Sequence, residues 1–179
     1  MLTEAQAIRL DSPSPQPSPW KGEGVGAIIR AARVQDLRAI LTIENCCFPL
    51  GVAFTARQVR RLLANPNAIA RVADDGPREG IAGWCVGLVR RAGHHVTGRI
   101  YTLAIDPDIQ GRGLGRLLVT NMLDELAARE VRRVYLEVRA DNSRAIALYE
   151  KLGFTIVRHL PDYYSAGQHG VSMRRLSPV

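Results

Sequence analysis

The sequence predicts an α+β domain with a single mixed, mostly antiparallel sheet of about seven strands, flanked by about four helices. The first observation is the length, because 179 residues suit one domain that can bury a core without disulfides or metals. The second is the composition, since 46% hydrophobic and 23% charged residues exclude wholesale disorder. The third is the order of patterns after residue 26, which reads β-α-α-β-β-β-α-β-α-β-β without an internal repeat.

The domain is expected to occupy residues 27–179, with residues 1–26 as a separate segment. Residues 11–26 read DSPSPQPSPWKGEGVG and contain four of the ten prolines. Such a stretch cannot build a packed core and favours extended conformations. We expect a disordered, low-complexity tail or an artefact of the assigned start site. A proline-rich docking ligand is the alternative interpretation.

The first half of the domain is predicted to contain four strands and two helices. Runs of β-branched and other apolar residues predict strands at 27–33, 68–74, 81–91 and 97–106. Apolar residues at helical spacing predict helices at 34–48 and 56–65. Thr55 can cap the second helix, and Pro49 and Pro66 end the two helices. Glycine-containing turns between the strands indicate hairpins.

The second half is predicted to contain two helices and three strands. An amphipathic pattern predicts a long helix at 114–130. A shorter helix at 142–153 is capped by Asn142 or Ser143 and ends at Gly153. The remaining runs of β-formers predict strands at 132–139, 154–160 and 169–175.

The charge favours an anionic partner. The chain has 24 Lys and Arg against 17 Asp and Glu, a net charge of +7. A basic domain attracts nucleic acid, anionic lipid or a polyphosphate cofactor. The basic residues are scattered in runs no longer than two, so nucleic-acid binding is disfavoured.

Other patterns limit the protein class. The longest apolar run, residues 81–89, is far shorter than the roughly 20 residues of a membrane helix, and the first ten residues lack a signal-peptide pattern. Three cysteines, two of them adjacent, argue against a disulfide framework and for a cytoplasmic setting. His94 and His95 have no third ligand at metal spacing, so we expect no metal site.

The most specific segment is the glycine-rich turn at residues 106–118, DPDIQGRGLGRLL, which follows a strand and opens a helix. Glycines allow close approach of the backbone to a ligand, and a helix start offers unpaired N–H groups to an anion. The turn lacks the Gly-Lys-Ser/Thr of a phosphate-binding P-loop and the glycine spacing of a dinucleotide fingerprint. A purely structural turn is the alternative interpretation.

The spacing Gln110-x-x-Gly113-x-Gly115 resembles the acetyl-CoA-binding motif of the GNAT N-acetyltransferases. The resemblance implies a three-layer fold in which the preceding strand splays from its neighbour and pairs with the pantetheine arm. It also implies that acetyl-CoA is the acetyl donor, without a metal. The cofactor-binding residues that it implies are Leu103, Ala104, Ile105, Gln110, Gly111, Arg112, Gly113, Leu114, Gly115, Arg116 and Asn142.

The second informative segment is LEVRADNSRAIALYEKLGF at residues 136–154. Glu137 is a carboxylate within an apolar strand, which suits a general base whose environment is tuned by burial. A surface position or a pairing with an arginine is the alternative. Tyr149 suits either the core, with its hydroxyl hydrogen-bonded, or a catalytic acid.

This segment resembles the RimI branch of the GNAT family, which acetylates the amino-terminal alanine of a ribosomal protein. The resemblance implies that Glu137 is the base and Tyr149 the acid. It places Tyr163 and Tyr164 in a loop beside the acceptor amine. Phe48 and Phe54 bound the other wall, FPLGVAF, which lacks the usual tryptophan of that branch.

The predicted reaction is transfer of acetyl from acetyl-CoA to a primary amine by direct attack. An α-amine, with a reference pKa of about 7.7–8.0, is neutral far more often than a lysine at about 10.4. This favours an α-amine weakly, and the resemblance to the RimI branch implies the amino terminus of a protein or peptide, such as a ribosomal protein, as the leading acceptor. A small-molecule amine is the alternative acceptor, and a non-catalytic acyl-CoA-binding module is the alternative of another class. The sequence does not indicate an oligomeric state.

Overall fold

The computed structural model describes residues 27–49, 51–74, 80–93 and 95–177, so the predicted tail at 1–26 lies outside the described residues. These residues contain one seven-stranded sheet in the order β1-β2-β3-β4-β5-β7-β6. The strands are β1 (Ile28–Ala31), β2 (Ala68–Asp74), β3 (Ile81–Ala92), β4 (His95–Ile105), β5 (Arg133–Arg139), β6 (Thr155–Ser165) and β7 (Gln168–Leu176). The α-helices are α1 (Leu37–Cys47), α2 (Ala56–Ala64), α3 (Leu114–Ala128) and α4 (Ser143–Lys151). The predicted element order and the predicted fold class are confirmed.

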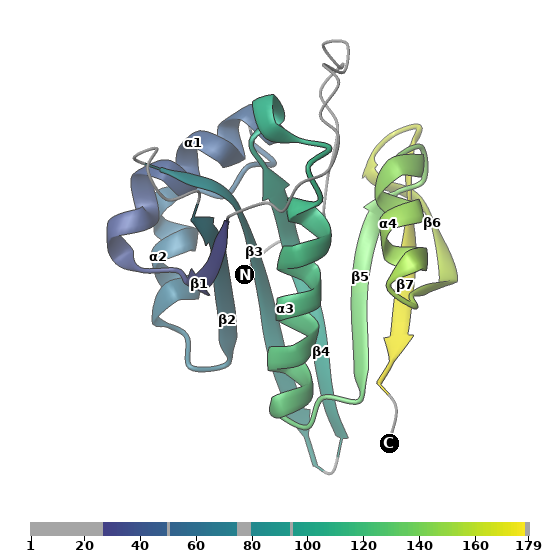
Figure 1. The fold of residues 1–179 in the computed structure, drawn as a ribbon. Coiled ribbons are helices and arrows are strands. Elements are labelled where there is room, and N and C mark those ends of the chain that lie inside the picture. The colour runs from purple at the N-terminus through teal and green to yellow at the C-terminus, as the bar shows by residue number, and fades with distance from the viewer. Residues whose placement is uncertain (1–26, 50, 75–79, 94, 178–179) are drawn as a thin grey trace.

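The sheet divides between β4 and β5. All neighbouring strands pair antiparallel except these two, which run parallel and pair only over Thr97–Arg99 on β4. The other edge of β4 pairs with β3 as far as Ile105. The backbone edge of β4 that faces β5 therefore has no ladder partner beyond Arg99 within this sheet. Figure 1 shows the two strands close at one end and apart at the other, the splayed pair that the sequence resemblance implied.

Two layers of helices cover the two faces of the sheet. Side chains of α3 and α4 form one core cluster with the sheet, and side chains of α1 and α2 form a second cluster on the opposite face (Figure 1). The largest fully buried side chain of the second cluster is Trp84 of β3. Burial of such apolar surface stabilises the fold by roughly 25 cal/mol per Å². The two faces of β5 divide accordingly, because Val134, Leu136 and Val138 belong to the α3–α4 cluster and Glu137 points to the other side.

Most predicted strand boundaries differ from the structure by at most two residues, but the end of the strand expected at 154–160 differs by five. The strand expected at 154–160 continues to Ser165, so Tyr163 and Tyr164 lie within β6 rather than in a loop. The pairing with β7 shifts between Leu160 and Ser165, where Asp162 adopts a positive φ of 50°. Asp162 accepts a hydrogen bond from Gly167 N–H at 2.7 Å. This bulge lets the strand pass Pro161, a residue that would otherwise end a strand pattern.

Candidate functional site

The glycine-rich turn leads from β4 into α3 through a single 3-10 turn, Pro107–Ile109. Gly111 and Gly113 have φ angles of +87° and +83°, a region that side chains with a Cβ rarely enter. Gly113 is the residue that precedes α3, and no side chain caps the helix there. The N–H groups of the first helical turn, beginning at Leu114, thus have no intrahelical acceptor. This arrangement suits an anion such as a pyrophosphate.

Three arginines and one glutamine surround this turn. Arg112 and Arg116, which the resemblance implies as cofactor-binding residues, are exposed. Arg144 of α4 is a third cation, which sequence reasoning missed, and its Nη2 lies 3.7 Å from the Cβ position of Gly111. Arg144 also donates to Gln110 Oε1 at 3.3 Å. The sequence places Arg144 in the first turn of α4, two residues after the cap, but it does not show that the starts of α3 and α4 lie close together.

Leu103, Ala104 and Ile105 are buried core residues of β4. Their side chains fill the two core clusters, so only their backbone is available to a ligand. The Ile105 carbonyl already accepts from Gln110 Nε2 at 3.2 Å and from Cys47 Sγ at 3.2 Å. Gln110 thus fixes the end of β4, and Gly115 packs between Leu103 and Leu148, 3.6 Å from each through its Cβ position.

Two buried polar atoms of the α4 region have no hydrogen-bond partner among the described residues: Tyr149 Oη and Asn142 Nδ2. Asn142 caps α4 by accepting from Ala145 N–H at 3.0 Å, which uses its oxygen and leaves the amide nitrogen. Burial raises the pKa of Tyr149 well above its ordinary value, and Cys85 and Tyr164 add to the rise. The Tyr149 hydroxyl is therefore protonated at neutral pH and is a hydrogen-bond donor.

Glu137 forms an ion pair with Arg99 on the face of the sheet opposite Tyr149. Its Oε2 lies 2.7 Å from Arg99 Nη2, and its side chain is 8% exposed. Ser172 Oγ of β7 lies 3.5 Å from Glu137 Oε1. The pairing with an arginine, which the sequence left as an alternative, is present in the structure. The carboxylate still lies where β4 and β5 separate.

Tyr163 and Tyr164 lie close to this ion pair. Their rings contact edge to face, with centroids 5.1 Å apart. The Tyr163 hydroxyl accepts from Arg99 Nη2 at 3.2 Å, so the structure brings Glu137 and Tyr163 together through Arg99. Gly170 of β7 makes room for both rings, because a Cβ there would lie 3.2 Å from Tyr164 Cε2 and 3.3 Å from Tyr163 Cδ1.

Phe48 and Phe54 are buried in the α1–α2 core, at the two ends of the loop that joins these helices. Phe54 packs edge to face on Trp84, with ring centroids 5.8 Å apart. Their side chains serve the core.

Glu44 of α1 holds this loop to the sheet, a role that sequence reasoning missed. Its Oε2 accepts from Phe54 N–H at 2.9 Å, and its Oε1 accepts from Trp84 Nε1 at 2.8 Å and from Thr102 Oγ1 at 3.2 Å. Burial raises the pKa of Glu44 to about 7, although these hydrogen bonds lower it. The sequence feature that could have indicated this role is that Glu44 lies at helical spacing with apolar residues such as Ile40.

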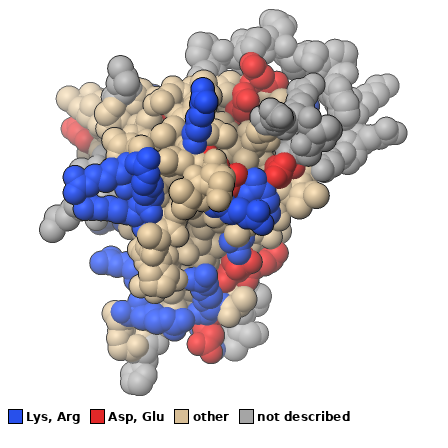
Figure 2. All heavy atoms as spheres, turned by 90° about the vertical axis from the view of Figure 1, so that its left-hand side faces the viewer, with Lys and Arg blue, Asp and Glu red and all other residues tan. Residues whose placement is uncertain are grey.

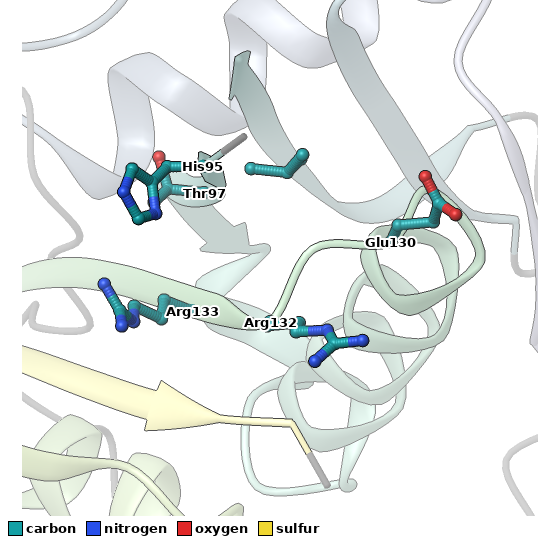
Figure 3. A pocket seen from close by; sticks show the side chains of 6 residues that line it. His95, Thr97, Glu130, Arg132 and Arg133 are labelled. Carbon is teal, nitrogen blue, oxygen red and sulfur yellow. The ribbon is translucent and has the colours of Figure 1, made fainter. Parts of the chain in front are cut away.

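A separate pocket of about 310 Å³ lies at the other ends of β4 and β5. Figure 3 shows that Arg132 and Arg133 point in opposite directions there and do not converge on one point. The lining residues are His95, Val96, Thr97, Glu130, Arg132 and Arg133. The pocket lies far along both strands from the glycine-rich turn and belongs to a different part of the molecule.

Charges on the α1–α2 side are distributed in separate groups. Figure 2 shows several blue groups with red and tan between them, rather than one continuous basic surface. Across residues 27–49, 51–74, 80–93 and 95–177, no three His, Cys, Asp or Glu side chains gather closely enough to hold a metal ion. No helix in these ranges has both the length and the apolar character needed to cross a membrane.

Comparison with known proteins agrees with this geometry. A stretch of 69 residues is 49% identical to the ribosomal protein bS18-alanine N-acetyltransferase of Salmonella typhimurium, covering 38% of this chain and 47% of that protein. A stretch of 93 residues is 46% identical to mycothiol acetyltransferase of Beutenbergia cavernae, covering 52% of this chain and 30% of that protein. The chain thus spans about half, or less, of the length of the curated relatives that it matches.

The structural comparison covers more of the chain. The crystal structure of the ribosomal-protein-S18-alanine N-acetyltransferase from Escherichia coli superimposes with a TM-score of 0.70 at 26% identity, covering 86% of this chain and 96% of that one. The model of the acetyltransferase (GNAT) family matches residues 37–154, which include β4, the glycine-rich turn, Glu137 and Tyr149. On this evidence, the chain belongs to the GNAT acetyltransferase family.

Proposed function

We propose that this protein transfers the acetyl group of acetyl-CoA to the amino-terminal α-amine of a protein or peptide. The observation that carries the proposal is the splay between β4 and β5, with Glu137 beside Arg99, the last paired residue of β4, on one face of the sheet and Tyr149 buried in the core cluster on the opposite face. A base on one side and a proton donor on the other are what the two halves of the reaction need.

The chain's own groups fit acetyl-CoA. The positive-φ glycines and the uncapped start of α3, with Arg112, Arg116 and Arg144 nearby, suit the phosphates. The unpaired backbone edge of β4 suits an extended arm with amide groups. Bound acetyl-CoA supplies the activated acetyl group as a thioester.

The proposed reaction is direct attack by the acceptor amine. The amine nitrogen forms a bond to the thioester carbonyl carbon, the carbon–sulfur bond breaks, and the amine loses one proton. Glu137 accepts that proton, directly or through a water. Tyr149 donates its hydroxyl proton to the leaving sulfur and is later reprotonated from solvent. The backbone N–H groups along the β4 edge are candidates for stabilising the oxyanion.

An α-amine acceptor is supported by chemistry and by similarity. Its reference pKa of about 7.7–8.0 leaves an appreciable neutral fraction at pH 7, so a single carboxylate is a sufficient base. Similar proteins are named for acetylating the alanine of ribosomal protein bS18. A ribosomal protein is therefore the first acceptor that we propose, and the cytoplasm, where such an acceptor and the free thiols Cys46, Cys47 and Cys85 would be found, is the proposed location.

The test is thiol release from acetyl-CoA with matched peptides. One set has free amino termini beginning with Ala, Ser, Met or Gly, and the other has the same peptides with blocked termini and an internal lysine. We expect turnover on the free termini, greatest with Ala. Turnover on neither set would refute peptide acetylation. Turnover restricted to small amines would instead support the alternative acceptor class.

A further inference from the structure

Arg99 lies at the point where the sheet divides. It is the last residue of β4 that pairs with β5, opposite Tyr135, before the strands separate. Gly98 faces Leu126 and Val131 of the α3 side, so the Arg99 side chain points to the opposite face, where Glu137 lies. The guanidinium therefore stands at the closed end of the splay, beside the proposed base.

One guanidinium group links three strands at this point. Arg99 Nη2 lies 2.7 Å from Glu137 Oε2 of β5 and donates to Tyr163 Oη of β6 at 3.2 Å. Its central carbon lies 5.3 Å from the ring centroid of Tyr101 on its own strand, within cation–π range. The same guanidinium nitrogen, which carries two N–H groups, therefore lies beside both a proposed catalytic group and the tyrosine pair.

The environment keeps this ion pair ordered and charged. The side chain of Arg99 is 21% exposed and that of Glu137 is 8% exposed, so solvent screens the pair less than a surface pair. Burial lowers the pKa of Arg99. The Glu137 carboxylate and the Tyr163 and Tyr101 side chains raise it by more than burial lowers it, so the pKa lies above the ordinary value of an arginine.

We propose that Arg99 is a positioning residue for acetyl transfer, which fixes the Glu137 carboxylate in one orientation and holds Tyr163 at the acceptor side of the splay. The inference rests on the proposed function. Arg99 also neutralises the charge of Glu137, so the acceptor site has no net negative charge from Glu137 that would attract cationic amines. Selectivity for an amine that arrives neutral follows from this pairing.

The test compares Arg99→Met with Arg99→Lys, both of which keep an apolar stem of similar length. We expect Arg99→Met to lower kcat about tenfold or more, because general-base catalysis contributes roughly 10²–10⁴-fold and depends on orientation. The KM for acetyl-CoA should stay unchanged. Arg99→Lys keeps the charge but not the fork that reaches two partners, so an intermediate kcat is expected. Arg90→Met, at an exposed position of β3, is the matched control.

The pH profile and a double variant separate positioning from a merely structural role. The groups that face Glu137 include Arg99 of β4 and Ser172 of β7, and Tyr163 of β6 contacts Arg99. A nearby cation favours the ionised carboxylate, so the acidic limb of kcat/KM should move to higher pH in Arg99→Met and stay in place in Arg99→Lys. Adding Arg99→Met to Glu137→Gln should cost little further activity. An unmoved limb together with additive losses would overturn the proposal.

A measurement without an acceptor keeps the two proposals distinguishable. Carbon-13 NMR of labelled glutamate carboxyls can follow the titration of Glu137, assigned by its loss in Glu137→Gln. We expect its midpoint to rise in Arg99→Met. If the wild-type protein acetylates no amine but this midpoint rises, the proposed function fails while the control of Glu137 by Arg99 stands. An unchanged midpoint would refute that control whatever the enzyme does.

Discussion

Glu44→Gln tests how the α1–α2 loop is held to the sheet. Burial raises the pKa of Glu44 from 4.5 to about 7 in the folded protein. The folded state therefore binds a proton more tightly than the unfolded state between these pH values. Stability falls as pH rises wherever the folded state holds more protons. The contribution of Glu44 is thus greatest below pH 4.5 and is lost as pH rises towards 7.

The magnitude follows from the size of the shift. One pKa unit corresponds to about 1.4 kcal/mol, so the change from 4.5 to about 7 is worth on the order of 3 kcal/mol. Glu44→Gln cannot titrate and lacks this dependence. Phe54 N–H and Trp84 Nε1 donate to different oxygens of Glu44, and glutamine replaces one of these oxygens with an NH₂ donor, so one hydrogen bond is lost and stability falls at every pH.

The assay is urea unfolding of both proteins at several pH values between 4.5 and 8, followed by circular dichroism. We expect the free energy of unfolding of the wild type, relative to that of Glu44→Gln, to fall by on the order of 3 kcal/mol over this range. Glu150→Gln, at an exposed position of α4, is the control and should follow the wild type. Parallel pH profiles for wild type and Glu44→Gln would refute the reasoning.

Three further variants test the site itself. Gly113→Ala places a side chain at φ +83°, which should cost roughly 1–2 kcal/mol of stability and raise the KM for acetyl-CoA in steady-state assays; an unchanged KM would contradict the phosphate assignment. Gly170→Ala brings a Cβ within 3.2 Å of Tyr164, so the KM for the peptide should rise while that for acetyl-CoA stays constant, and the reverse pattern would count against an acceptor role of the tyrosine pair. Tyr149→Phe removes a buried hydroxyl without a hydrogen-bond partner among the described residues, so thermal unfolding should change little while kcat falls on the order of 10²-fold; full activity would exclude Tyr149 as the acid.

Local sequence patterns predicted most of the fold. Apolar periodicity located the seven strands and four α-helices of the described residues, and the glycine spacing located the turn before α3, because each signal lies within a few consecutive residues. The end of β6 was missed because the bulge at Asp162 depends on its pairing with β7. The strand pattern around Pro161 does not indicate that β7 is the partner strand.

The links within the site depend on contacts between distant parts of the chain. Glu137 and Tyr149 lie in one continuous motif and were predicted together. Arg99 pairs with Glu137 across two strands of the divided sheet, and Glu44 reaches Trp84 from another helix. Neither pairing follows from spacing along the chain, because each is set by strand order and by the face to which a side chain points.

The short ladder between β4 and β5 also has a consequence for local opening. Among the described residues, only Thr97–Arg99 of β4 joins β1–β4 to the group formed by β5, β7 and β6 through backbone pairing. Amide hydrogen exchange should therefore reveal two cooperative units, with the second opening at a lower free energy. A ligand arm lying between the strands would act as an inserted strand and join the two units. Acetyl-CoA should then slow amide exchange in β5 as well as in β4, although its proposed charged contacts, those of the phosphates, lie at only one end of the ligand.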